Sequence, residues 1–359
     1  MADPELRATL REESARFLTT VADPSWARVA ALGWPGIEIP EEHGGLGLSF
    51  AETCLLLEEQ GRVLHRGPYF ATAVLGVGAL LGATEEQRAA WLPRIASGEA
   101  IVTAAVDGGA GAALTLDARG SGPDSRGSAP GARGSAADTP GSAADTPGPA
   151  PARLTGAIAF VPDLDVADAV VVAAGDALFL VSASDLEPVA QPTHDRTRSL
   201  FSAHLRGVAA DPMPGSAQTL RDRAAIALAA DCVGGAAAAL DMTVAYLQDR
   251  RQFGKPIGAF QALQHRAADM LLALENARSA AAHAATDPTP AAASIAKSVA
   301  GEAFVHVAAE TVSLHGGIGF TWEHDAHRFL KRAKLNQAWM GDTGAHRERL
   351  ARLALGMEA

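Results

Sequence analysis

Apolar residues recur every three to four positions over both ends of the chain, and this period predicts helices there. Ser49 and Thr84 each stand directly before such a segment and are expected to cap it. Glu58 and Glu59 are expected on a solvated or partner-facing side of their helix. Within the first 100 residues, the expected helices include residues 6–18, 50–62, 71–81 and 85–95.

The helical pattern returns after residue 216 in longer, Ala- and Leu-rich segments. Gly254, Pro256 and Gly258 lie between the first two segments, and they predict a tight turn between two long helices. The expected helices of this region are residues 217–249, 260–285, 291–314, 325–340 and 343–355.

The middle of the chain changes to short β-like runs separated by turns, which predicts a small antiparallel β-domain. A low-complexity insert, residues 118–152, interrupts this region and contains a tandem repeat, residues 134–140 followed by 141–147. The insert has no aromatic residue, so we expect it to be disordered and without a direct catalytic role. The expected domains are residues 1–100, 101–212 and 216–359.

Composition narrows the class of protein. The chain has 359 residues and a net charge of -11, which argues against a nucleic-acid partner. Cys54 and Cys232 lie in apolar helical contexts and are expected to be buried thiols in a reducing compartment. The N-terminus does not have the features of a signal peptide, and no uninterrupted apolar run approaches the ~18 residues of a membrane span. These features predict a cytoplasmic protein without a membrane partner.

Three segments are candidates for ligand binding. In the turn of residues 250–261, Arg250 offers a planar donor fork to a phosphate, or it caps the end of its own helix. Glycines in the loop of residues 315–320 let a backbone approach a ligand closely, although a glycine helix stop explains them equally well. The basic run of residues 327–334 is either a solvated face or part of a site.

In this order and spacing, these segments resemble the acyl-CoA dehydrogenase family. The resemblance also includes the loop of residues 33–47, the Glu58-Glu59-Gln60-Gly61-Arg62 run and Leu92-Pro93. It implies a mainly α fold with a helical N-terminal domain, a middle antiparallel β-barrel and a C-terminal four-helix bundle. It further implies FAD, α,β-dehydrogenation of an acyl-CoA thioester and an electron-transfer acceptor protein as partner.

The resemblance assigns roles to the candidate residues. In the family, the Arg that matches Arg250 contacts the flavin diphosphate of a neighbouring subunit. Residues that match Gln252 and Phe253 border the adenine end of the cofactor, and Gln261 belongs to the same surface. The loop that matches Gly316, Gly317 and Gly319 lines the FAD.

The catalytic base departs from the family pattern, so the catalytic residue stays unknown. Most members carry a Glu where this chain has Met340, and others carry it where the chain has Ala224. A thioether cannot accept the α-proton. The nearest carboxylates are Asp342 and Asp222; Asp342 is alternatively a helix cap for the segment from residue 343 onward.

The β-domain departs as well, because residues 104–109 and 156–161 differ from the runs that usually grip the flavin ring. This combination resembles a smaller-subunit branch of the family from bacterial degradation of steroids and other bulky acyl-CoA compounds. There, two unlike subunits share FAD sites and one supplies the base. We therefore expect a subunit of a hetero-tetramer that relies on a partner's base. The alternatives are a homomeric enzyme, such as a homo-dimer, with Asp342 or Asp222 as base, and a non-catalytic structural subunit.

Overall fold

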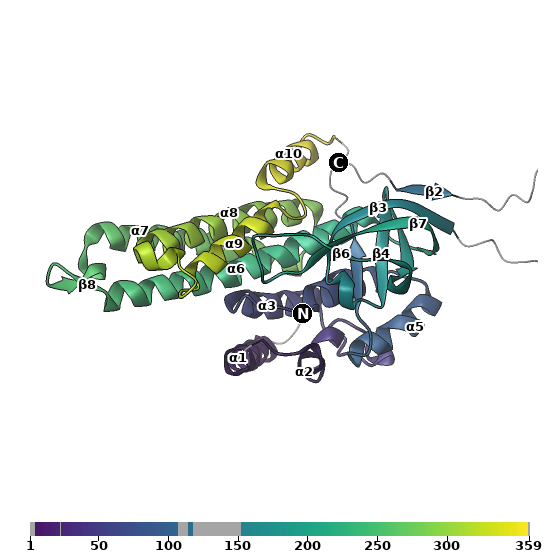
Figure 1. Ribbon diagram of the computed structural model, residues 1–359, viewed down its shortest axis with the longest axis horizontal. Helices are drawn as coiled ribbons and strands as arrows, with labels where there is room; N and C mark the ends of the chain where they lie inside the picture. The colour runs from purple at the N-terminus through teal and green to yellow at the C-terminus, as the bar shows by residue number, and fades with distance from the viewer. Residues whose placement is uncertain (1–3, 22, 107–113, 118–151, 358–359) are drawn as a thin grey trace, which may run out of the picture.

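The computed structural model describes residues 4–21, 23–106, 114–117 and 152–357 (Figure 1). The expected insert of residues 118–152 lies outside these ranges except for its last residue. Helices dominate both ends of the chain and a curled β-sheet lies between them in the sequence, so the prediction of a mainly α fold with a β-domain is confirmed. The domain limits at residues 100 and 212 stay a prediction.

The N-terminal helices lie against one side of the C-terminal bundle (Figure 1). Ser49 and Thr84 cap α3 and α5, each in a capping box with the residue three positions on, as expected. The helical elements of this part are α1 (Pro4–Thr20), α2 (Trp26–Ala30), η1 (Trp34–Gly36), η2 (Glu41–His43), α3 (Phe50–Arg62), η3 (Phe70–Gly76), α4 (Val77–Leu80) and α5 (Glu85–Ala96).

Two expectations for this part were wrong in detail. The helix expected at residues 71–81 is divided into a π-helix, η3, and the short α4. Gly76 ends η3 where a Cβ would lie 2.3 Å from the carbonyl oxygen of Val102, so the glycine lets η3 pack directly on the sheet. Glu58 and Glu59 are buried, and the Arg11 guanidinium bonds to both carboxylates at 2.9 and 2.8 Å, so the solvated alternative was wrong, whereas nothing tests the partner-facing one.

The sheet is a half-barrel with the order β1-β4-β5-β7-β3-β2, and β6 pairs with β7. All pairs are antiparallel except β1 and β4, which run parallel in the register Val102 to Ala169, whereas the expected domain was antiparallel throughout. Among the described strands, the end strands β1 and β2 do not pair. The strands are β1 (Val102–Ala105), β2 (Thr115–Asp117), β3 (Ala152–Pro162), β4 (Ala169–Ala174), β5 (Ala177–Ser182), β6 (Val189–Ala190) and β7 (Leu200–Met213), with η4 (Leu164–Val166) and η5 (Ala183–Asp185) between them.

The C-terminal helices form a long bundle that extends away from the sheet (Figure 1). The turn expected after α6 contains a small hairpin, β8 (Arg251–Gln252) and β9 (Lys255–Pro256), followed by η6 (Ile257–Ala259). The helices are α6 (Ala217–Asp249), α7 (Gln261–Thr286), α8 (Pro290–His315), η7 (Gly316–Phe320), α9 (Ala326–Ala338) and α10 (Thr343–Ala354).

Helix α6 is the centre of the hydrophobic core, and 83% of its most apolar 18-residue window is buried. It is long and apolar enough to cross a membrane, but this burial is that of a core helix. Close contact with α3 depends on two glycines: a Cβ on Gly234 would lie 1.8 Å from the Glu58 carbonyl oxygen, and one on Gly61 would lie 2.3 Å from that of Asp231. Cys54 of α3 and Cys232 of α6 are both free and buried, as predicted.

Candidate functional site

The turn that follows α6 projects from the end of the bundle and contains Arg250, Gln252, Phe253 and Gln261, all of them exposed. Phe253 is 90% exposed, with its backbone at φ 51°, and its ring meets that of Phe260 edge to face. Within the described residues, no carboxylate lies within 4.0 Å of the Arg250 guanidinium. An exposed ring and an uncompensated guanidinium on the same turn form a surface that a phosphate-bearing ligand can use.

The glycine loop lies at this same end of the bundle. Tyr246, one turn before Arg250, stacks on His315 with ring centroids 4.4 Å apart, and His315 is the last residue of α8. Gly316 and Gly317 follow at once, are exposed, and have no atom within 4 Å of an added Cβ. The two segments that the sequence singled out are therefore neighbours in space.

Gly319 and Gly316 also have reasons of their own to be glycines. A Cβ on Gly319 would lie 2.7 Å from the Val312 carbonyl oxygen, so close packing on α8 requires a glycine. Gly316 has φ 64° and ends α8. Of the three, only Gly317 has no such internal reason. Gln252 donates its side-chain amide to the Arg251 carbonyl oxygen at 2.7 Å and can turn away from it because it is exposed.

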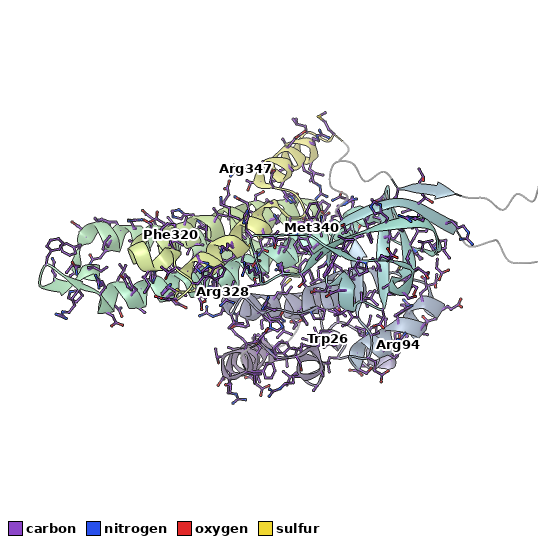
Figure 2. The ribbon with its side chains drawn as sticks, in the orientation of Figure 1. Trp26, Arg94, Phe320, Arg328, Met340 and Arg347 are labelled. Carbon is purple, nitrogen blue, oxygen red and sulfur yellow. The ribbon has the colours of Figure 1, made fainter. Side chains whose placement is uncertain are left out.

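Met340 lies at the other end of the bundle, next to the sheet (Figure 2). It follows the end of α9 with φ 59° and is only 7% exposed. The neighbouring Trp339 packs on Phe70 with ring centroids 5.0 Å apart. The Arg198 guanidinium lies 5.1 Å from the centroid of Phe70 and 5.6 Å from that of Trp339. Aromatic rings and a guanidinium thus fill the space beside the position where a base was sought.

Both nearby aspartates have partners within the chain. Asp342 is the N-cap of α10 and accepts the backbone N–H of Ala345 at 2.8 Å. Asp222 is buried and forms a two-pronged ion pair with Arg349 of α10. Ala224 is fully buried in the core of α6. The helix-cap role of Asp342 is the alternative that the sequence had left open.

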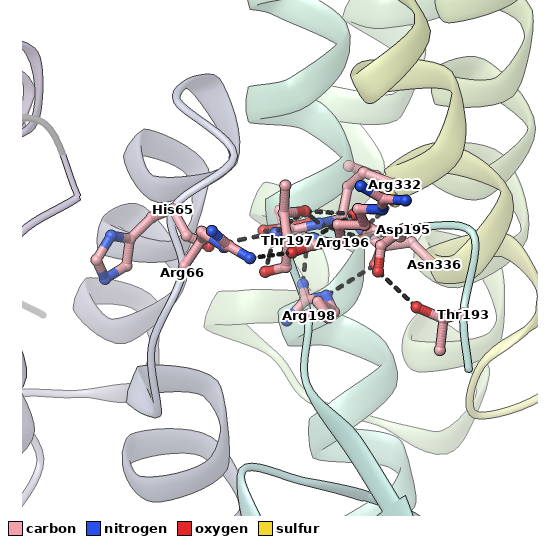
Figure 3. Close-up of polar contacts among 11 residues, drawn as sticks. His65, Arg66, Thr193, Asp195, Arg196, Thr197, Arg198, Arg332 and Asn336 are labelled. Atoms are coloured by element: carbon pink, nitrogen blue, oxygen red, sulfur yellow. Dashed lines mark hydrogen bonds and ion pairs between the residues drawn. The ribbon is translucent and has the colours of Figure 1, made fainter. Parts of the chain in front are cut away.

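A buried charge network joins the three parts of the chain and was missed by the sequence analysis (Figure 3). Arg332 is 1% exposed and donates to Asp195 at 2.9 Å, to Asp231 at 3.1 Å and to the His65 carbonyl oxygen at 3.2 Å. Arg198 lies 3.1 Å from the second oxygen of Asp231. Asn336 donates to this same oxygen at 2.5 Å.

The ionisation of this network follows from burial and from opposite charges. Burial raises the pKa of Asp231, but the charges of Arg198 and Arg332 outweigh burial and hold that pKa below its ordinary value. Burial lowers the pKa of Arg332, and the charges of Asp231 and Asp195 raise it above the ordinary value. Asp231 and Arg332 are therefore both charged near neutral pH. The basic run of residues 327–334 is consequently not a wholly solvated face.

The expected differences in the flavin-ring region lie partly outside the described residues, which omit residues 107–113. Within the described part, Phe160 breaks the β3–β7 register between Ile158 and Val161. It has φ 56° and is 39% exposed, and its backbone N–H donates to the Gln191 side chain at 2.7 Å. A half-exposed aromatic residue on a bulge is available for contact with a flat ligand or a second subunit.

Comparison with known proteins places this geometry in a family. Residues 3–99 match the acyl-CoA dehydrogenase N-terminal domain and residues 216–355 match the acyl-CoA dehydrogenase C-terminal domain. Acyl-CoA dehydrogenase IpdE2 of Mycobacterium tuberculosis is 34% identical over 353 residues, which cover 93% of this chain and 92% of that protein.

Two solved structures have the same fold. The Tcur3481-Tcur3483 steroid ACAD G363A variant is 30% identical, with a TM-score of 0.83 over 98% of both chains. The ChsE4-ChsE5 complex from Mycobacterium tuberculosis is 27% identical, with a TM-score of 0.83 over 100% of this chain and 99% of the other. The domain matches and the full-length similarity agree, and the chain belongs to the acyl-CoA dehydrogenase family of oxidoreductases.

Proposed function

We propose that this chain is one subunit of an FAD-dependent acyl-CoA dehydrogenase assembly and that a related partner subunit supplies the catalytic base. The observation that carries the proposal is the contrast between the two ends of the bundle. Arg250, Phe253 and Gly317 are exposed and open at one end, whereas Met340 is buried among packed rings at the other.

FAD, when bound, supplies the acceptor of the β-hydride, and this chain's part is to hold its diphosphate and adenine. Arg250 would offer two parallel N–H donors to diphosphate oxygens, and the exposed Phe253 ring and Gln252 amide would border the adenine. Gln261 extends the same surface, and the backbone N–H groups at Gly316, Gly317 and Gly319 lie on the neighbouring loop. The open space at Gly316 and Gly317 fits a ligand that approaches the backbone closely.

The residues at the Met340 end of the bundle support the proposal that the catalytic base lies on another chain. A proton acceptor has to lie within hydrogen-bond reach of the α-carbon, and its lone pair has to be basic near neutral pH. The Met340 thioether has no such basicity, Asp342 is engaged as a helix cap, and Asp222 is paired with Arg349. Ala224 and Met340 occupy the two positions at which a family member carries its Glu.

The geometry of one chain also favours a shared site. Ala224 and Asp249 are 25 residues apart on α6, about 38 Å at the rise of an α-helix. The Arg250 turn and the Ala224 position of one chain therefore lie too far apart to contact the same group of one bound ligand. We infer that the Arg250 turn contributes to a flavin whose ring lies on a neighbouring subunit.

The similar proteins suggest the assembly and the substrate class. Two solved neighbours are each named for two chains, and one of them is a steroid ACAD. A hetero-tetramer with a related dehydrogenase, acting on a steroid side-chain or other bulky acyl-CoA in the cytoplasm, is the form that we propose. An electron-transfer protein then reoxidises the flavin. The free, buried state of Cys54 and Cys232 is consistent with a reducing compartment.

Co-expression with a related subunit tests the proposal. The purified lone chain is expected to hold little flavin and to show no turnover of acyl-CoA, and co-expression is expected to give a yellow, active assembly. Arg250→Ala in that assembly should lower both the flavin content and kcat/KM. The matched control is Arg352→Ala, an exposed arginine on α10 that pairs with Glu348.

Two results would support the alternatives instead. Robust turnover by the lone chain that disappears in Asp342→Asn would favour a homomeric enzyme with its own base. Full flavin content and full activity of the assembly after Arg250→Ala would favour a non-catalytic structural subunit.

A further inference from the structure

A basic cavity lies on the surface above the buried network, and part of its lining directly follows the glycine loop. Its volume is ≈ 370 Å³. Three separate stretches line it: Arg66, which follows α3; residues 194–197 of the segment between β6 and β7; and the N-terminal part of α9 with the residues before it, from Trp322 to Lys331. Figure 3 shows the Arg66 side chain directed toward Arg196 and Thr197.

Three cations of this cavity have no carboxylate partner. Within the part of the chain that the structure describes, no Asp or Glu oxygen lies within 4.0 Å of the charged groups of Arg66, Arg196 or Lys331. Arg328 is paired with Asp325 at 2.8 Å, at the exposed rim. In a chain with 41 acidic and 30 basic residues, three unpaired cations around one cavity indicate a ligand with negative charge.

Hydrogen bonds underneath hold the cavity in shape. Asp195 accepts the backbone N–H and the hydroxyl of Thr197 at 2.8 and 2.5 Å, and its other oxygen accepts Arg332 at 2.9 Å. The Arg66 guanidinium donates to the Arg196 carbonyl oxygen at 2.5 Å. The negative charge of Asp195 is thus directed inward to Arg332, and the segment presents Arg196 outward from a fixed backbone.

Trp322 fixes two of the cations. The Arg196 guanidinium lies 5.0 Å from its ring centroid and the Lys331 ammonium lies 4.2 Å from it. Both side chains are held by cation–π contact although the indole is 65% exposed. Side chains that are already ordered lose less entropy when a ligand binds them.

We propose that this cavity binds the phosphate or diphosphate group of a small molecule. A guanidinium offers a fork that matches two phosphate oxygens, an ammonium adds a point charge, and Arg66, Arg196 and Lys331 supply both kinds. The volume is in the range of small-ligand sites. A concave cluster from three stretches fits a compact anion better than an acidic protein surface, which needs cations spread over a face of ~800 Å².

Coenzyme A and free inorganic phosphates share this chemistry, and a titration separates them. The probes are inorganic pyrophosphate, adenosine 3′,5′-bisphosphate and coenzyme A, titrated calorimetrically into the full chain at low ionic strength. We expect saturable binding that weakens with salt. Arg196→Gln and Lys331→Gln should each weaken it about tenfold. The matched control is Arg347→Gln on α10, an exposed arginine distant from the cavity (Figure 2).

The tryptophan gives a second readout. Binding beside Trp322 should change the protein fluorescence, and Trp322→Phe should remove that change while calorimetry still detects binding. If Lys331→Gln fails to fold, Arg66→Gln, at an exposed position, replaces it. Tighter binding of coenzyme A than of pyrophosphate identifies the coenzyme as the source, and equal binding identifies free phosphate.

Two results would overturn the proposal. One is pyrophosphate binding of equal strength in Arg196→Gln, Lys331→Gln and the parent chain. The other is binding of a phosphate-free polyglutamate peptide in the absence of any binding of pyrophosphate, which would make the cavity a docking face for an acidic protein. Neither result bears on which subunit supplies the catalytic base, because that question is settled by the co-expression experiment.

Discussion

At the scale of single residues, the buried guanidinium of Arg332 is expected to stabilise the fold. Arg332→Gln leaves Asp195 and Asp231 in the interior without their shared cation. Arg198 still pairs with Asp231, but Asp195 loses its cation. We expect the free energy of unfolding to fall by about 3–5 kcal/mol, because an unpaired buried charge keeps its desolvation penalty. Urea unfolding followed by circular dichroism measures this loss.

The matched control for Arg332 is Arg88→Gln. Arg88 pairs with Glu85 at the surface, and such a pair contributes about 1 kcal/mol or less. Equal stability losses in the two variants would mean that the buried network does not stabilise the fold.

His65 predicts how stability depends on pH. Burial lowers the pKa of His65 to about 4, against an opposing effect of Asp23, whereas an unfolded chain has a histidine pKa of about 6.5. The unfolded state therefore binds more protons between pH 6.5 and 4, and the contribution of His65 to stability is lost as the pH falls through this window. The slope is at most about 1.4 kcal/mol per pH unit.

His65→Gln should flatten the stability curve between pH 6.5 and 4, measured by urea unfolding at each pH. The backbone carbonyl that accepts Arg332 is unchanged by this substitution. His306→Gln, at an exposed position on α8, is the control and should leave the slope as it was. A parent curve and a His65→Gln curve with the same slope would contradict the prediction.

At the scale of elements, two variants of Asp342 distinguish the role of a helix cap from that of a catalytic base. Asp342→Asn keeps a side-chain oxygen for the N–H of Ala345, so the stability and the activity of the co-expressed assembly should both be retained. Asp342→Ala should lower the free energy of unfolding by about 1 kcal/mol and still leave activity. Thermal unfolding and assembly turnover provide the two readouts, and loss of turnover in Asp342→Asn alone would show a base.

Two Gly→Ala changes, one at the crossing of α3 and α6 and one in α8, are expected to have opposite effects on stability. Gly234→Ala places a methyl group 1.8 Å from the Glu58 carbonyl oxygen and forces the helices apart, which should destabilise by about 1–3 kcal/mol. Gly301→Ala, in α8, meets nothing nearer than 3.6 Å and should stabilise by about 0.5–1 kcal/mol. Denaturant midpoints of the two variants check the signs, and a stabilised Gly234→Ala would contradict the packing.

Local signals were enough to predict elements, but they did not predict the contacts between distant elements. Ser49 with α3, Thr84 with α5 and the limits of α6 followed from caps and apolar period, because these depend on neighbours in sequence. The parallel β1–β4 pair did not follow, since register depends on the whole sheet. Arg332 looked like part of a surface charge run because its partner Asp195 is 137 residues away.

The same distinction between local sequence signals and distant contacts applies to the candidate site. The Arg250 turn and the glycine loop were found from residue types, and Tyr246 on His315 then placed them together. The filled space beside Met340 had no signal in the sequence, because Phe70, Arg198 and Trp339 come from three different parts of the chain. Whether these segments hold FAD stays a prediction that the co-expression experiment addresses.

At the scale of the whole molecule, the contrast between the two ends of the bundle predicts how a carboxylate introduced at the Met340 position would affect acyl-CoA turnover. Met340→Glu supplies the residue type that the family uses, but Phe70 and Trp339 still fill the neighbouring space with 3% exposure each. We expect no acyl-CoA turnover by the lone Met340→Glu chain, measured with an artificial electron acceptor. Met340→Gln has nearly the same shape without the charge and is the matched control.

In the co-expressed assembly, Met340→Gln tests whether this chain or its partner supplies the catalytic base. If the base belongs to the partner, Met340→Gln leaves kcat unchanged, because the Met340 position then takes no part in proton transfer. Turnover by the lone Met340→Glu chain above that of Met340→Gln would show that one chain contains a complete substrate site. In that case the packed rings open during binding, and the chain is an enzyme that has lost only its carboxylate.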